Sequence, residues 1–106
     1  MLRLAELICE NLTELALLDS LDMGKLVTDA VTINAPGSAV FFLWYAEAID
    51  KIYDEIASTG PRDLALVCKV PLGVIGAVAP WNFPLDMTKW KSAAALAVVR
   101  WAIRWC

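Results

Sequence analysis

The sequence contains no histidine, few glycines and prolines, and no unbroken hydrophobic run long enough to cross a membrane. Without histidine, the chain has no imidazole for acid–base catalysis, and most zinc sites are excluded. The longest apolar candidate, residues 70–81, is interrupted by Pro71, Gly73 and Pro80. It falls short of the ~20 residues that a membrane span needs. The sequence therefore predicts neither a membrane span nor a metal site.

The three cysteines, Cys9, Cys68 and Cys106, show no metal or redox spacing. An odd number without such spacing favours reduced, buried thiols in a cytoplasmic protein. Arg3 and Glu6 interrupt the only early apolar stretch, so no signal peptide is predicted. A net charge of −3 without a Lys/Arg cluster argues against a nucleic-acid partner.

A hydrophobic content of 59% is high for a domain of 106 residues. Such a composition is typical of a segment that belongs to a larger core. We therefore expect exposed apolar surface and a piece of a longer protein.

Hydrophobic periodicity predicts helices in the first half of the chain. Apolar residues recur at steps of three and four over residues 4–18, which indicates one amphipathic helix, and Gly24 suits a left-handed cap after it. The proline and glycine of residues 34–38 predict a break, after which Ser38 would cap a helix over residues 39–56.

The second half alternates between strand and helix patterns. A period of two predicts a strand over residues 64–70, and small apolar residues predict a buried parallel strand over residues 74–79. After a turn at residues 80–84, the pattern of residues 87–97 fits a helix. Strand, turn and helix form the first half of a βαβ unit, so the predicted fold class is α/β.

The turn Pro80-Trp81-Asn82-Phe83-Pro84 is the strongest local feature. Its prolines fix φ at both ends and remove two backbone donors, so the Asn82 amide is held in a nearly fixed direction. Such an amide can stabilise an oxyanion, or it can cap the helix that follows. The residues alone leave both interpretations open.

The run PLGVIGAVAPWNFPL at residues 71–85, with Trp90-Lys91 after it, resembles the signature of the aldehyde dehydrogenase superfamily. Residues 21–25 and 44–51 resemble family segments in the same order, and the second is most similar to bacterial aminoaldehyde dehydrogenases such as γ-glutamyl-γ-aminobutyraldehyde dehydrogenase. The resemblance implies that residues 1–97 form N-terminal helices plus the first strand, turn and helix of an incomplete Rossmann-like NAD(P)-binding domain.

The resemblance also implies a reaction, the oxidation of an aldehyde to a carboxylate. In the family a cysteine thiolate attacks the carbonyl, hydride passes to NAD or NADP, and a glutamate-activated water releases the acid. None of the cysteines has the nucleophile's context, and Asn82, as oxyanion donor, is the one catalytic group assigned. The chain alone is expected to be inactive and to bind no cofactor tightly, whereas the parent enzyme is expected to be a homo-oligomer.

Cofactor and substrate residues follow from the same resemblance. The residues that would line the NAD(P) cleft are Ala79, Pro80 and Trp81. The residues that would face the aldehyde tunnel are Phe83, Met87 and Trp90. The same apolar side chains also fit plain core packing.

Two charged residues of the final helix each allow two interpretations. Lys91 matches a family lysine near the proton-release path, but it also fits a lysine that extends from a helix end. Asp86 replaces an apolar residue of many members. It would favour a substrate with a cationic end, or it would complement the helix dipole while facing water.

The family pattern stops near Ala97, and residues 98–106 are expected to be a frame-shifted tail. Read from the last base of the Trp101 codon, the codons force glycine first and valine last, and they permit Gly-Asn-Ser-Val-Val, which the family places at its next strand. Sequencing the codons of Ala102, Ile103 and Arg104 tests this expectation, because the absence of Asn-Ser-Val in that frame would overturn it.

The tail also supports a different class of function. Residues 93–106 combine apolar side chains with Trp101, Trp105, Arg100 and Arg104. This composition suits a small helical interaction protein or a membrane-adhering protein without catalysis.

Overall fold

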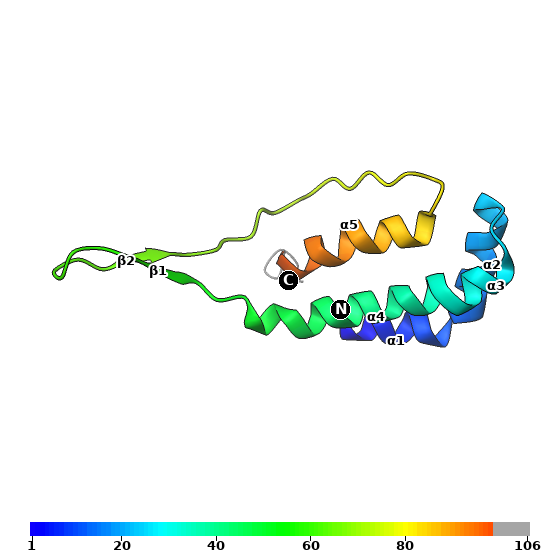
Figure 1. Ribbon diagram of the computed structural model, residues 1–106, viewed down its shortest axis with the longest axis horizontal. Helices are drawn as coiled ribbons and strands as arrows, with labels where there is room; N and C mark the ends of the chain where they lie inside the picture. Colours follow the sequence, from blue (N-terminus) through cyan, green and yellow to red (C-terminus); the bar gives the residue numbers. More distant parts are fainter. Residues whose placement is uncertain (99–106) are drawn as a thin grey trace, which may run out of the picture.

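The computed structural model describes residues 1–98, which form a helical body and a long arm (Figure 1). The body contains α1 (Leu2–Glu10), α2 (Leu12–Met23), α3 (Val27–Asp29), the π-helical turn η1 (Ala30–Asn34), α4 (Ala35–Ala48), the 3-10 turn η2 (Ile49–Lys51) and α5 (Pro84–Val98). The arm carries β1 (Glu55–Ala57) and β2 (Ala65–Val67). The radius of gyration is 18.1 Å. A compact chain of this length would have a radius of gyration of about 13 Å. The larger value means that much of the surface of this chain is not covered by other parts of the chain.

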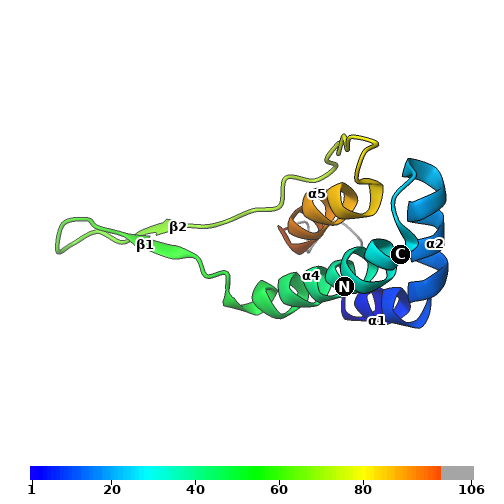
Figure 2. The ribbon, with the colours of Figure 1, turned by 45° about the vertical axis from the view of Figure 1, so that its right-hand side comes forward.

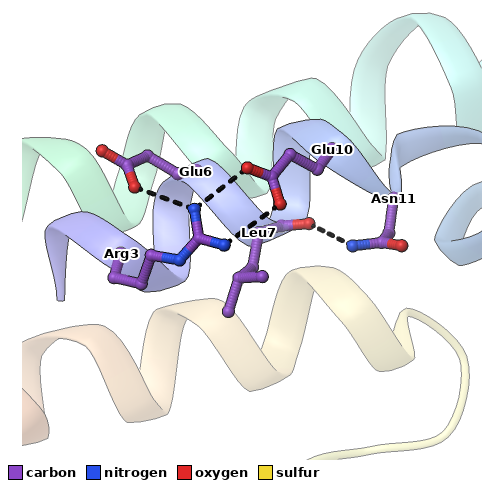
Figure 3. A network of polar contacts seen from close by, with 5 residues as sticks. All are labelled: Arg3, Glu6, Leu7, Glu10 and Asn11. Carbon is purple, nitrogen blue, oxygen red and sulfur yellow. Dashed lines mark hydrogen bonds and ion pairs between the residues drawn. The ribbon is translucent and has the colours of Figure 1, made fainter.

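The single helix predicted over residues 4–18 is divided at Asn11, where the backbone has φ −110° and ψ 24°. Both the Asn11 backbone N–H (3.1 Å) and its side-chain Nδ2 (2.8 Å) donate to the Leu7 carbonyl. Figure 3 shows the side-chain bond. On the exposed side of α1, Arg3 bridges Glu10 (2.9 Å) and Glu6 (3.2 Å). Hydrogen bonds to Glu10 and then Glu6 raise the pKa of Arg3. An asparagine side chain that binds the carbonyl of the preceding helical turn competes with continuation of the helix. Hydrophobic spacing alone did not reveal this break.

The end of α2 follows the prediction. Gly24 has φ +75° and donates its N–H to the Ser20 carbonyl at 2.9 Å. The Ser20 hydroxyl in turn donates to the Lys25 carbonyl at 2.5 Å. A glycine is suited here because residues with a side chain rarely adopt this left-handed backbone conformation.

The break predicted at residues 34–38 is wrong, because the helix continues through them. The Ala35 N–H reaches back five residues to the Ala30 carbonyl, and this π-turn directly precedes Pro36, which has no N–H to contribute. Ser38 does not cap a helix. It is buried within α4 and donates to the Asn34 carbonyl at 2.8 Å.

The helix predicted to reach Ile56 ends earlier, and residues 55–57 form β1 instead. Ile52 already has an extended backbone, and Ile56 pairs with Leu66 in an antiparallel hairpin. The strand predicted over residues 64–70 is confirmed for the three residues of β2. Ile56 fits the helical spacing, but it is 75% exposed on an arm that projects from the body (Figure 1), so no packing favours a helix there.

No strand is assigned at residues 74–79, which run along an extended path from the arm back to α5 (Figures 1 and 2). Val74 and Val78 are almost fully exposed. A parallel strand needs the backbone of a neighbour, and within residues 1–98 the only paired strands are β1 and β2. The buried strand predicted here therefore does not form among residues 1–98, while the expected exposed apolar surface is confirmed.

The core lies along α4, which packs against α1 and α5. In Figure 1 both helices run beside α4. The buried residues of the core are Ala5, Ile8, Ala39, Phe42 and Ala93, and a second cluster consists of Ala16, Ala30 and Ala35. Most members are alanines, so the helices approach closely and the core is thin. The helix predicted over residues 87–97 is confirmed as α5.

Cys9 and Cys68 are exposed free thiols, which corrects the expectation of buried cysteines. Cys9 lies on α1, and Cys68 follows β2 on the arm. Cys106 and the predicted frame-shifted tail, apart from Val98, lie outside the described residues. Across residues 1–98, the helices are too short or too polar to traverse a bilayer.

Candidate functional site

The turn at residues 80–83 lies exposed between the extended segment and the start of α5. Pro84 opens the helix, where its fixed φ is favourable, and the Met87 N–H donates to the Phe83 carbonyl at 2.8 Å. The Asn82 side chain makes no hydrogen bond within the described part of the chain. Asn82 therefore does not cap α5, and its amide is available to a partner outside this chain.

The cap of α5 comes from α2 instead. Asp19 Oδ1 accepts a hydrogen bond from the Leu85 N–H at 3.2 Å. Asp19 is only 5% exposed, and its Oδ2 has no hydrogen-bond partner in residues 1–98. A carboxylate at a helix N-terminus satisfies a free N–H and complements the dipole.

Asp86 belongs to a partly buried polar cluster. Its Oδ1 lies 2.5 Å from Lys89 Nζ, and its Oδ2 accepts a hydrogen bond from Asn34 Nδ2. The Asp86 and Lys89 side chains are only 20% and 10% exposed. Asp86 does stand in the first turn of α5, but its carboxylate faces protein groups rather than water. The cation that a desolvated carboxylate needs is supplied by Lys89, so the structure does not leave this carboxylate free for a substrate.

Lys89 reaches this cluster beside Gly37 of α4. A Cβ built at position 37 would lie 3.3 Å from Lys89 Nζ, which is closer than ordinary contact. The missing side chain thus provides the space that the ammonium group occupies. The spacing of Asp86 and Lys89 in one helix could have suggested their ion pair, whereas nothing local pointed to Asn34 or Asp19.

The remaining predicted residues have different surroundings within residues 1–98. Trp81 (78% exposed) and Trp90 (57%) face outward, and the Lys25 Nζ lies 4.4 Å from the centre of the exposed Phe83 ring. Met87 is half-buried. These exposures argue against plain core packing for Phe83 and Trp90.

A groove of about 750 Å³ separates the extended segment from α5. Its walls are residues 73–78 on one side and Lys91, Ser92, Ala95 and Leu96 on the other. Lys91 is the one predicted site residue in this wall, while Ala79 and Pro80 continue the extended segment beyond it as exposed residues. Among residues 1–98, no three side chains are placed to hold a metal ion.

Comparison with known proteins gives consistent matches. The family model described as "Aldehyde dehydrogenase family" matches residues 1–99. The NADP/NAD-dependent aldehyde dehydrogenase PuuC of Escherichia coli is 48% identical over 95 residues, which are 90% of this chain and 19% of that protein. Aminoacetaldehyde dehydrogenase of Pseudomonas aeruginosa is 50% identical over 97 residues, which are 92% of this chain and 20% of that protein.

A solved structure agrees with these sequence matches. The crystal structure of an indole-3-acetaldehyde dehydrogenase complexed with NAD+ superposes with a TM-score of 0.87 at 49% identity, covering 92% of this chain and 20% of that one. The chain thus spans about a fifth of the length of these relatives. The superposition confirms the α/β fold class, with helices and extended segment in the arrangement of the relatives.

Proposed function

Because this chain belongs to the aldehyde dehydrogenase family, we propose that it forms part of an NAD(P)-dependent enzyme that oxidises an aldehyde to a carboxylate. The observation that carries the proposal is the turn at residues 80–84, where a stiff frame presents the Asn82 amide without a hydrogen-bond partner in residues 1–98. The nicotinamide cofactor, when bound, accepts the hydride.

Asn82 supplies the electrostatic part of the chemistry. Attack on an aldehyde carbon moves negative charge onto the carbonyl oxygen, and Asn82 Nδ2 donates a hydrogen bond to this oxygen. A donor held in place before the reaction stabilises the developing charge without reorganisation. The prolines on both sides of the turn provide that pre-set direction.

The cofactor and the substrate would contact the residues around Asn82. Ala79, Pro80 and Trp81 are exposed at the end of the extended segment, so their backbone and the Trp81 indole can form one wall of the NAD(P) cleft. On the other side, the apolar side chains of Phe83, Met87 and Trp90 line the aldehyde path. Lys91, in the groove wall, is proposed to lie on the path by which the proton leaves.

The finer proposal, an aminoaldehyde substrate, rests on residues 44–51 and on the aminoacetaldehyde relative. Asp86 does not support it, because its carboxylate is already paired with Lys89. Sequence identity to the relatives does not distinguish between candidate substrates either. The aminoacetaldehyde enzyme is 50% identical to this chain, and the indole-3-acetaldehyde enzyme is 49% identical.

The test is a chimera in which the matching segment of the E. coli relative is replaced by that of this chain. We expect NAD(P)-dependent aldehyde oxidation within tenfold of the E. coli enzyme, measured as NAD(P)H absorbance. The isolated 106-residue chain is the matched control. It should show no turnover and no NAD+ binding at micromolar concentrations by calorimetry, because it offers one wall of the cleft. A soluble, folded but inactive chimera would contradict the proposed function.

A further inference from the structure

We propose that Asp86 is a positioning residue that fixes the start of α5 against α4 and thereby sets the direction of the Asn82 amide. The catalytic part of this inference rests on the proposed function. The structural part, an ordered turn that depends on Asp86, does not.

The two oxygens of Asp86 hold two different parts of the chain. Oδ1 binds Lys89 Nζ at 2.5 Å, one helical turn further along α5, while Oδ2 binds Asn34 Nδ2 at the junction of η1 and α4. Asn34 is only 3% exposed, and it is part of a helix fixed by core packing. Lys89 compensates the carboxylate charge, so Asp86 can remain in this partly buried position.

Asp19 provides a second attachment at the adjacent residue. Its carboxylate accepts a hydrogen bond from the Leu85 N–H at 3.2 Å, so α2 and the end of η1 hold consecutive residues of α5. Two attachments of this kind restrict both the position and the rotation of the helix start.

Asn82 is separated from these attachments by Phe83 and Pro84 alone. Pro84 has a fixed φ, and the Phe83 carbonyl is bound by the Met87 N–H, so the orientation of the helix passes directly into the turn. Residues 80–83 of the turn are exposed, and the Asn82 side chain adds no hydrogen bond within residues 1–98. The direction of the amide therefore depends on where α5 begins, and Asp86 and Asp19 determine that place.

The experiment compares Asp86→Asn, Asn82→Ala and the double variant in the chimera. Asp86→Asn is expected to lower kcat at least tenfold, with less than threefold change in KM for NAD+ and for the aldehyde. In the Asn82→Ala background the same substitution should lower kcat less than twofold, because the group through which Asp86 acts is gone. Asp63→Asn, the same change at an exposed site in the loop between β1 and β2, is the matched control and should leave all values unchanged.

A second readout does not need activity. Amide hydrogen exchange of residues 81–87 should accelerate at least tenfold in Asp86→Asn, while exchange across α1 stays the same. Unchanged hydrogen exchange in the turn would overturn the positioning role, whether or not the chimera is active. Inactivity of the chimera would count against the proposed function alone.

Two kinetic results would also overturn the inference. Equal losses of kcat with and without Asn82 would mean that Asp86 acts on stability and not through the amide. A loss confined to kcat/KM for aminoacetaldehyde, with an uncharged aldehyde of equal length unaffected, would mean that Asp86 contacts the substrate.

Discussion

Asn82→Ala in the chimera is expected to lower kcat by about 10²–10³-fold, the usual cost of removing one oxyanion donor. KM should change little, because the lost hydrogen bond strengthens only as charge develops on the carbonyl oxygen. The fold should persist, since the Asn82 side chain is exposed and makes no hydrogen bond within residues 1–98. Steady-state kinetics with NAD+ and an aldehyde provide the measurement.

The isosteric Asn82→Asp variant separates the donor from the volume of the side chain. It keeps the shape but replaces the N–H donor with a carboxylate oxygen, so kcat should be at least as low as in Asn82→Ala. If Asn82→Ala retained kcat within a factor of ten, Asn82 would have no such role, and the helix dipole or another donor would have to stabilise the oxyanion.

Lys89→Met is expected to destabilise the chain by about 3–5 kcal/mol, because it leaves the partly buried Asp86 carboxylate without its cation. Lys89 Nζ lies 2.5 Å from Asp86 Oδ1, and its side chain is only 10% exposed, so solvent screens the pair weakly. Methionine preserves the length of the side chain, so packing changes little. Urea denaturation followed by helical circular dichroism should show a lower midpoint, or loss of helix without urea.

Two further variants serve as controls for the effect of Lys89→Met. Lys51→Met is the matched control, because Lys51 pairs with Asp50 at the surface and its side chain is 66% exposed, so no measurable shift is expected. The double variant Lys89→Met/Asp86→Leu removes both charges and should recover part of the loss, because it also leaves the buried Asn34 amide without its acceptor. A midpoint unaffected by Lys89→Met would show that the pair contributes nothing to stability.

Local signals in the sequence predicted the elements that local contacts determine. Gly24 marked the end of α2, and the helical spacing of residues 87–97 identified α5. Hydrophobic spacing did not predict the helix ends that a single side chain or a distant contact determines. Asn11, for example, ends α1 because its side chain binds the preceding helical turn. At Pro36 a proline was expected to stop a helix, but a π-turn accommodates it.

The residues of the turn itself made the candidate site predictable from the sequence. The distant residues that hold the turn in place could not be predicted. Asn82 and its proline frame are visible within five residues, whereas Asp19 and Asn34 are 66 and 52 residues from the groups that they bind. No periodicity connects positions so far apart. Asp86 was noticed only as a departure from the family pattern, and its partner Lys89 shows why a charge is tolerated there.

The extended segment at residues 74–79 has a consequence for how this chain behaves among its own copies. Its side chains are apolar, and its backbone carries a row of N–H and C=O groups without a backbone partner in residues 1–98. Such a row is a template for strand addition between molecules. Pro71 and Pro80 bracket the row, and neither has an N–H with which to extend an intermolecular ladder. Pro71 and Pro80, the second of which also opens the turn, thus act as gatekeepers that confine any fibril-like pairing to the few residues between them.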